Sequence, residues 1–254
     1  MTLTTTERIN AIREYLEKVD DFAFRFGTEI QRILDDHNAN GGHLEYAYVE
    51  HFHTEIIGLS KFIQYLLNDK INRKYVFFGT RTSIEILLYL EHILKLAKSG
   101  STEMLNFLSK DLAQSAAAIN KAATPNKDHN IHKTLKNIDT INKILDTGFK
   151  LEEIDESTKV FPSVYKLCKE SKLSLKDAKT TDMYHVYVLY SEANHARLSN
   201  HHSVTADSEL DVCWALEYYI EIYIRFYNQL LEADKFPPEF LSELNSIKLS
   251  LGLR

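Results

Sequence analysis

The chain has 254 residues, of which 44% are hydrophobic and 26% are charged, and its formal net charge at pH 7 is −6. These proportions are typical of an ordinary globular protein with a substantial core. The negative charge argues against a protein that coats nucleic acid non-specifically, because such binding needs a broadly basic surface; a local phosphate-binding site remains compatible with it. Eight Gly and four Pro residues are few for this length, which favours long helices over a many-stranded sheet.

Apolar residues recur at helical spacing along most of the chain, and turn-forming residues divide them into segments. Thr4 and its neighbours provide N-cap chemistry for the first helix, and Gly100 fits the C-terminal cap of the third. No strand-like alternation is found. The sequence therefore predicts an all-α multi-helix bundle of about eight helices, which cover residues 7–37, 43–68, 72–98, 101–123, 132–147, 161–170, 181–200 and 209–230, with a short helix after the Pro-Pro pair at 237–238.

We expect a single helical domain over residues 1–254, with the acidic stretch 150–160 as the best candidate for a flexible connection. Cys168 and Cys213 lie in apolar-periodic segments, which favours two buried thiols in a reducing compartment. The first residues lack the features of a secretory signal, and the longest apolar stretch, 84–96, is too short and too charged to cross a bilayer. These features predict a cytoplasmic protein that does not enter a membrane.

Two helices carry polar side chains that could share one site. Arg81 and Glu85 are four residues apart inside an otherwise apolar helix, so they lie on one face and can pair. Ser191 and His195 are also four residues apart on a later helix, with Glu192 between them, and this helix could supply polar partners. Three interpretations of the group stay open: a buried structural network, an active site, or a plain surface ion pair.

The Arg-Thr-Ser-Ile-Glu stretch at 81–85 and the Tyr-rich Ser-x-x-x-His helix at 187–195 together resemble a bacterial family of helical proteins known only as a domain of unknown function. The likeness covers residues 75–197. It implies a helical fold and no activity. It also implies one shared polar site, made of Arg81, Glu85, Ser191 and His195.

A second motif follows directly along the chain. Arg197 and His202 are separated by four residues, which resembles the Arg-x4–6-His motif of HEPN-type ribonucleases. Those enzymes are small all-helical proteins, often toxins or antiviral effectors, which dimerise so that two motifs face one RNA strand. The resemblance implies cleavage without a metal ion. Arg197 would hold the phosphate and stabilise the charged transition state, and His202 would act as the acid or base, with His201 as a shifted alternative.

A metal-dependent alternative rests on the kind of ligands found in di-metal carboxylate bundles, which combine Glu-x-x-His pairs with further carboxylates. The residues concerned are Glu50 with His53, Glu192 with His195, and the additional Glu29 and Glu85. Against this alternative, we expect the histidines of the second helix, His43, His51 and His53, to lie on its solvated side.

The leading hypothesis is a HEPN-like, metal-independent endoribonuclease, an RNA-targeting toxin or defence effector, that works as a homodimer without a cofactor and can have a neutralising partner protein. The alternative class is a non-enzymatic helical interaction module, in which the polar network only fixes the packing. The di-metal bundle enzyme is the third hypothesis. Tyr184, Tyr187 and Tyr190 are interpreted first as core packing, with base stacking as the alternative.

Overall fold

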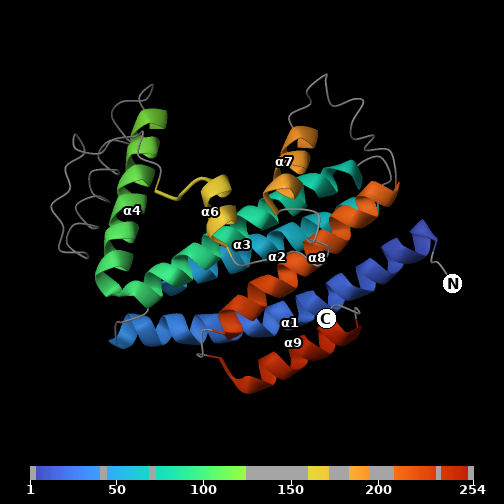
Figure 1. The fold of residues 1–254 in the computed structure, drawn as a ribbon. Coiled ribbons are helices and arrows are strands. Elements are labelled where there is room, and N and C mark those ends of the chain that lie inside the picture. The colour runs from blue at the N-terminus through green and yellow to red at the C-terminus, as the bar shows by residue number, and fades with distance from the viewer. Residues whose placement is uncertain are drawn as a thin grey trace. The chain divides into compact units, whose positions relative to one another are not determined.

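A computed structural model describes residues 4–40, 45–68, 73–123, 160–171, 183–194, 209–232 and 236–250. These residues form eight α-helices and one short 3-10 helix, with no strand among them (Figure 1), so the predicted all-α class is confirmed. The α-helices are α1 (Thr5–Asn40), α2 (Glu45–Leu67), α3 (Val76–Ser99), α4 (Ser101–Ala123), α6 (Val164–Glu170), α7 (Met183–Asn194), α8 (Glu209–Leu231) and α9 (Pro238–Ser250), and η1 (Arg73–Tyr75) directly precedes α3. The helix predicted at 132–147 lies outside the described residues.

The chain divides into two compact units, one made of Met1–Leu94 with Val164–Arg254 and the other of Lys95–Ser163. In the second unit, Gly100 separates α3 from α4 with a φ of 132°, a left-handed conformation that favours glycine, as its predicted capping role requires. The rings of Phe107 and Phe161 meet edge to face at 4.9 Å in this unit. The expectation of a single domain stays a prediction, because the proposed connection at 150–160 lies almost wholly outside the described residues.

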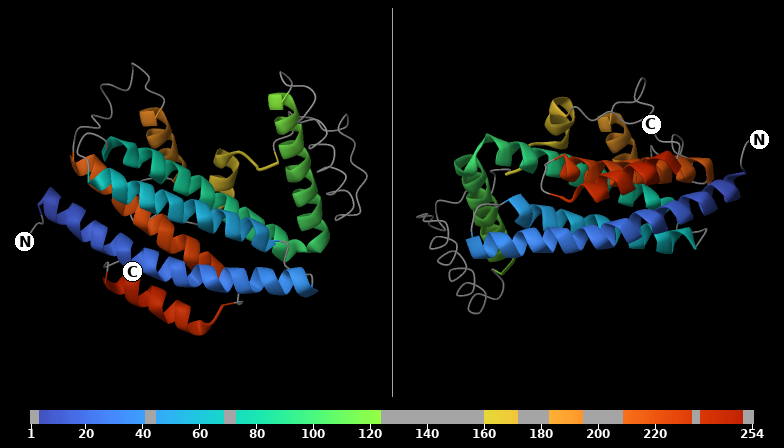
Figure 2. Two further views of the ribbon diagram at one scale, coloured as in Figure 1. Left: turned by 180° about the vertical axis from the view of Figure 1, so that it is seen from behind. Right: turned by 90° about the horizontal axis from the view of Figure 1, so that it is seen from below.

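The first unit is a bundle in which α1 packs along α2 and α8, while α9 lies against α1 and α8 (Figure 2). Thr4 caps α1, since its Oγ1 accepts the amide of Glu7 at 3.3 Å and the Glu7 carboxylate accepts the Thr4 amide at 2.7 Å. The centre of the bundle is aromatic. Phe22 and Phe26 of α1 both approach the buried Tyr227 of α8 at 5.2 Å between ring centroids.

A carboxyl group is held inside this bundle. The hydroxyl of Tyr223 donates to one oxygen of Asp20 at 2.8 Å, and the Gln64 amide donates to the other at 2.5 Å. Burial raises the pKa of Asp20, and the two hydrogen bonds act in the opposite direction. Asp20 is therefore a polar joint between α1, α2 and α8 rather than a surface charge.

The expectation that His53 lies on the solvated side of its helix is wrong. His53 is buried, and its Nε2 lies 3.1 Å from the backbone oxygen of Ala23. It follows the buried Val49 by four residues and so shares the inner stripe of α2, where the absence of a side chain at Gly27 of α1 makes room for its ring. Burial lowers the pKa of His53. His51 is exposed as expected, and His43 lies outside the described residues.

The short helix α7 lies across α3 with α6 beside it (Figure 1). It buries Met183, Val186 and Tyr190, and the ring of Tyr190 packs on Phe77 of α3 at 5.2 Å between centroids. Because these buried positions are three and four residues apart, they occupy one side of α7. None of the described helices combines the length and apolarity needed to cross a membrane.

Candidate functional site

The candidate site lies where α3 meets α7, and α3 provides its charged half. Thr80 and Ser83 are fully buried within α3, and their hydroxyl groups contact backbone oxygens. The Thr80 hydroxyl donates to the Val76 oxygen at 3.1 Å and lies 3.0 Å from the Ala215 oxygen. The Ser83 hydroxyl donates to the Thr80 oxygen at 2.7 Å. Arg81 and Glu85 are on the neighbouring, partly exposed side of the helix. The apolar faces of α3 thus orient this pair toward α7.

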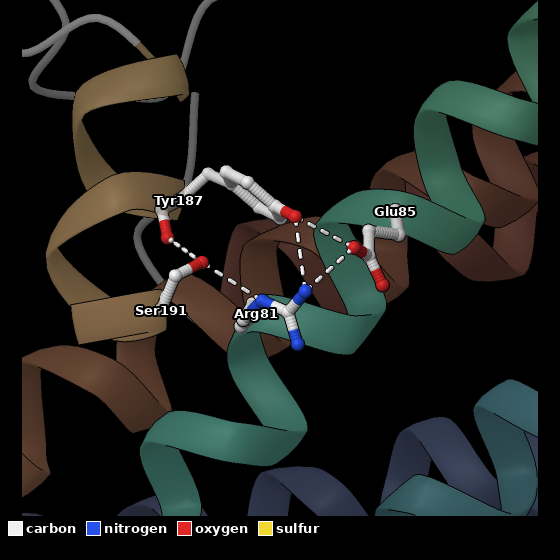
Figure 3. A network of polar contacts seen from close by, with 4 residues as sticks. All are labelled: Arg81, Glu85, Tyr187 and Ser191. Carbon is white, nitrogen blue, oxygen red and sulfur yellow. Dashed lines mark hydrogen bonds and ion pairs between the residues drawn. The ribbon is translucent and has the colours of Figure 1, made fainter. Parts of the chain in front are cut away.

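Four side chains form one connected cluster at this contact, which we call the Arg81 cluster (Figure 3). Arg81 donates from Nε to the Ser191 hydroxyl at 2.8 Å and from Nη2 to Glu85 and to the Tyr187 hydroxyl, both at 3.0 Å. Tyr187 donates in turn to Glu85 at 2.7 Å. Ser191 donates back to the Tyr187 carbonyl at 2.7 Å, so the donor and acceptor roles are consistent throughout.

The cluster is partly shielded from water and is electrostatically balanced. The Arg81 and Glu85 side chains are each 23% exposed and carry opposite charges. Burial raises the pKa of Tyr187, an effect that the Arg81 guanidinium opposes and the Glu85 carboxylate reinforces. Tyr187 is therefore protonated near neutral pH, as its hydrogen bond to Glu85 requires. The guanidinium carbon of Arg81 also lies 5.1 Å from the centroid of the Tyr187 ring, within the range of a cation–π interaction.

One part of Arg81 is not used by the cluster. The Nε and Nη2 donors all have partners, whereas Nη1 donates to no other described residue (Figure 3). A guanidinium fork with a free terminal nitrogen can donate to a phosphate or carboxylate oxygen without breaking its existing bonds. The cluster therefore joins two helices and also offers hydrogen-bond donors to an anion.

The structure brings together three of the residues predicted to share a site, Arg81, Glu85 and Ser191, so the interpretation as a plain surface ion pair is wrong. Sequence reasoning did not include Tyr187 in this site, although its place four residues before Ser191 puts both on one face of α7. Glu192 belongs to α7, but its side chain is not described. The remaining predicted residues, His195, Arg197, His201 and His202, lie outside the described residues.

The described residues do not bring together the ligands of a di-metal centre. No three His, Cys, Asp or Glu side chains in this part of the chain are grouped so that they could hold a metal ion. Glu50 is exposed, whereas His53 is buried and hydrogen-bonded to a backbone oxygen. The two side chains therefore lie in different environments and do not face one common metal site. Glu29 pairs with Arg32 on its own helix at 2.8 Å.

No known protein family, characterised protein or solved structure matches this chain. The structure thus shows an all-helical protein whose family is not identified, and only the geometry of its site bears on its function.

Proposed function

We propose that this protein is a metal-independent endoribonuclease in which Arg197 and His202 act on RNA beside the Arg81 cluster. One observation supports the proposal above the others. Arg81 fixes the last described turn of α7 to α3 through Ser191, and the Arg-x4-His motif follows on the same chain only six residues later. Since six residues span at most about 20 Å, the proposal needs no long connection between Ser191 and Arg197.

The proposed reaction needs no group beyond the protein and the RNA. His202 takes the proton of a ribose 2′-hydroxyl, whose oxygen attacks the adjacent phosphorus. The bond from phosphorus to the 5′-oxygen breaks, and the protonated His202 passes its proton to that oxygen, which restores the neutral imidazole. Arg197 stabilises the charge that develops on the phosphate oxygens. The products are a 2′,3′-cyclic phosphate and a 5′-hydroxyl. In the proposed homodimer, two copies of the motif face one strand.

The test is cleavage of a labelled RNA by the purified protein in the presence of a chelator. We expect cleavage by the wild type, and loss of cleavage in both Arg197→Ala and His202→Ala. His51→Ala and Arg32→Ala are matched controls, because His51 is exposed and the side chain of Arg32 is 61% exposed, and both lie on other helices. Cleavage that survives both active-site substitutions would sink the assignment.

A second candidate function is a non-enzymatic interaction module, and one observation favours it. The described bonds of the Arg81 cluster satisfy one another and join α3 to α7, which is what a purely structural network requires. Under this alternative the folded protein cleaves no RNA and contains no metal. Stoichiometric iron or manganese in the purified protein would instead favour the di-metal enzyme, the third hypothesis.

A further inference from the structure

A row of three tyrosine rings runs from α6 across α7 to the Arg81 cluster. Tyr165 meets Tyr184 edge to face at 5.0 Å between centroids, and Tyr184 stacks with Tyr187 at 6.2 Å with an angle of 21° between the ring planes. A cation lies at each end: Lys169 Nζ is 4.6 Å from the Tyr165 centroid, and Arg81 lies over Tyr187. We call Tyr165, Tyr184 and Tyr187 the tyrosine row.

Core packing does not account for this row. The core side of α7 is formed by other residues, among them Tyr190, which is only 5% exposed, whereas Tyr165 is 47% exposed and Tyr184 is half-buried. The C-terminal end of α6 is also held in place, because the Ser171 hydroxyl donates to Glu91 of α3 at 2.5 Å. The row is therefore a partly exposed aromatic surface on an anchored support.

Each end of the row carries a cationic side chain that keeps N–H donors for a ligand. Glu85 is bound within the Arg81 cluster, and Glu170 pairs with Lys166 at 3.8 Å. In the described part of the chain, Lys169 has no carboxylate partner, and Nη1 of Arg81 has no hydrogen-bond partner. Partly exposed aromatic rings flanked by cations have the surface chemistry that binds unpaired nucleotides: bases stack on the rings, and phosphates contact the cations.

We propose that single-stranded RNA binds along the tyrosine row, with bases stacked on Tyr165 and Tyr184 and phosphates contacted by Lys169 and by Nη1 of Arg81. This inference rests on the proposed ribonuclease and specifies the form of its substrate. Paired bases are stacked inside a duplex and do not present their faces to a row of rings, so the row selects unpaired RNA over duplex RNA.

The test is the affinity of the full chain for a short fluorescent oligouridylate with 2′-O-methyl groups, which the proposed reaction cannot cleave, measured by fluorescence anisotropy. Each of Tyr165→Ala and Tyr184→Ala should weaken binding about tenfold, the range found for loss of one base-stacking ring. Tyr165→Phe and Tyr184→Phe keep the ring and should bind as the wild type does. Tyr65→Ala is the matched control, since Tyr65 is a 70% exposed tyrosine on α2.

The outcomes separate this inference from the proposed function. Equal binding by the wild type and both alanine variants, no binding by the wild type, or equal affinity for a duplex RNA of the same length would each overturn the tyrosine row. If cleavage is seen in those cases, the ribonuclease stands without the row. If binding depends on Tyr165 and Tyr184 but RNA with free 2′-hydroxyls is not cleaved, the row stands and the ribonuclease does not. Thermal melting of each variant verifies that a loss of binding is not a loss of folding.

Discussion

Replacement of Arg81 by methionine tests how strongly the Arg81 cluster holds α7 on α3. Methionine keeps much of the apolar length of the side chain and removes all three hydrogen bonds, to Ser191, Glu85 and Tyr187. A hydrogen bond contributes about 0.5–1.5 kcal/mol net to stability. Because Arg81 and Glu85 are 23% exposed, water screens the charges and each contribution falls toward the low end. We expect Arg81→Met to lower the free energy of unfolding by about 2 kcal/mol.

Glu85→Gln separates the ion pair from the other bonds. The amide oxygen of glutamine can still accept from Tyr187, so we expect this variant to cost only about 0.5–1 kcal/mol. The double variant should then show a coupling energy of about 0.5–1 kcal/mol, the range for a partly exposed pair. Arg225→Met is the matched control, because Arg225 pairs with Glu221 four residues earlier on the same helix. The Arg225 side chain is 21% exposed, close to the 23% of Arg81. It should cost about 0.5 kcal/mol.

The assay combines urea denaturation with hydrogen exchange of peptides that cover α7 and α8. In Arg81→Met, the amides of α7 should exchange faster than in the wild type, since the helix loses its anchor, while those of α8 should change little. A cost for Arg81→Met no greater than that of Arg225→Met, with unchanged exchange in α7, would refute the conclusion that the cluster fixes this helix.

Gly27→Ala and Asp20→Asn test the core of the bundle by thermal and urea unfolding, with Gly58→Ala, at an exposed position, as a control for the first. A methyl group at Gly27 would lie 2.7 Å from Cε1 of the buried His53, so Gly27→Ala should destabilise by about 1–3 kcal/mol, whereas Gly58→Ala, which meets no neighbour, should stabilise by up to about 1 kcal/mol. Equal effects of the two would contradict the close approach of the His53 ring to Gly27. The pKa of Asp20 is raised by burial above its ordinary 3.8, so the wild type loses stability as pH rises from that ordinary value through the raised pKa, and Asp20→Asn does not. The melting temperature of the wild type relative to that of Asp20→Asn should therefore fall as the pH rises from the ordinary pKa of 3.8 through the raised one. A difference that stays constant with pH would show that burial does not raise the pKa of Asp20.

Much of the fold could be predicted because helices are determined largely by residues that are close together in the sequence. Helical periodicity and the caps at Thr4 and Gly100 locate most helices to within a few residues. The Arg81–Glu85 pair is equally local, since residues four apart on a helix always share a face. Such signals identify which face of a helix is apolar but do not say which neighbour covers it.

The rest depended on contacts between residues far apart in the chain. We expected His53 to face solvent because histidine is a polar residue. In the structure, however, the backbone oxygen of Ala23 provides a hydrogen-bond partner for the buried ring, and the missing side chain of Gly27 provides the space for it. Tyr187 is a comparable case, because its role appears only when α7 lies against α3, more than a hundred residues away in sequence. No periodicity in a single helix encodes either contact.

The structural and functional interpretations of Arg81 are compatible, because a guanidinium has five N–H donors. Three of them hold Ser191, Glu85 and Tyr187, and the two on Nη1 are unused within the described residues. The same side chain can thus fix α7 and still donate to a phosphate. With Glu85 beside it and a net charge of −6 on the chain, the attraction must come from directed hydrogen bonds and stacking rather than from a broad positive field. RNA binding along the tyrosine row would therefore depend only weakly on salt, because the salt dependence scales with the number of phosphates that cations neutralise.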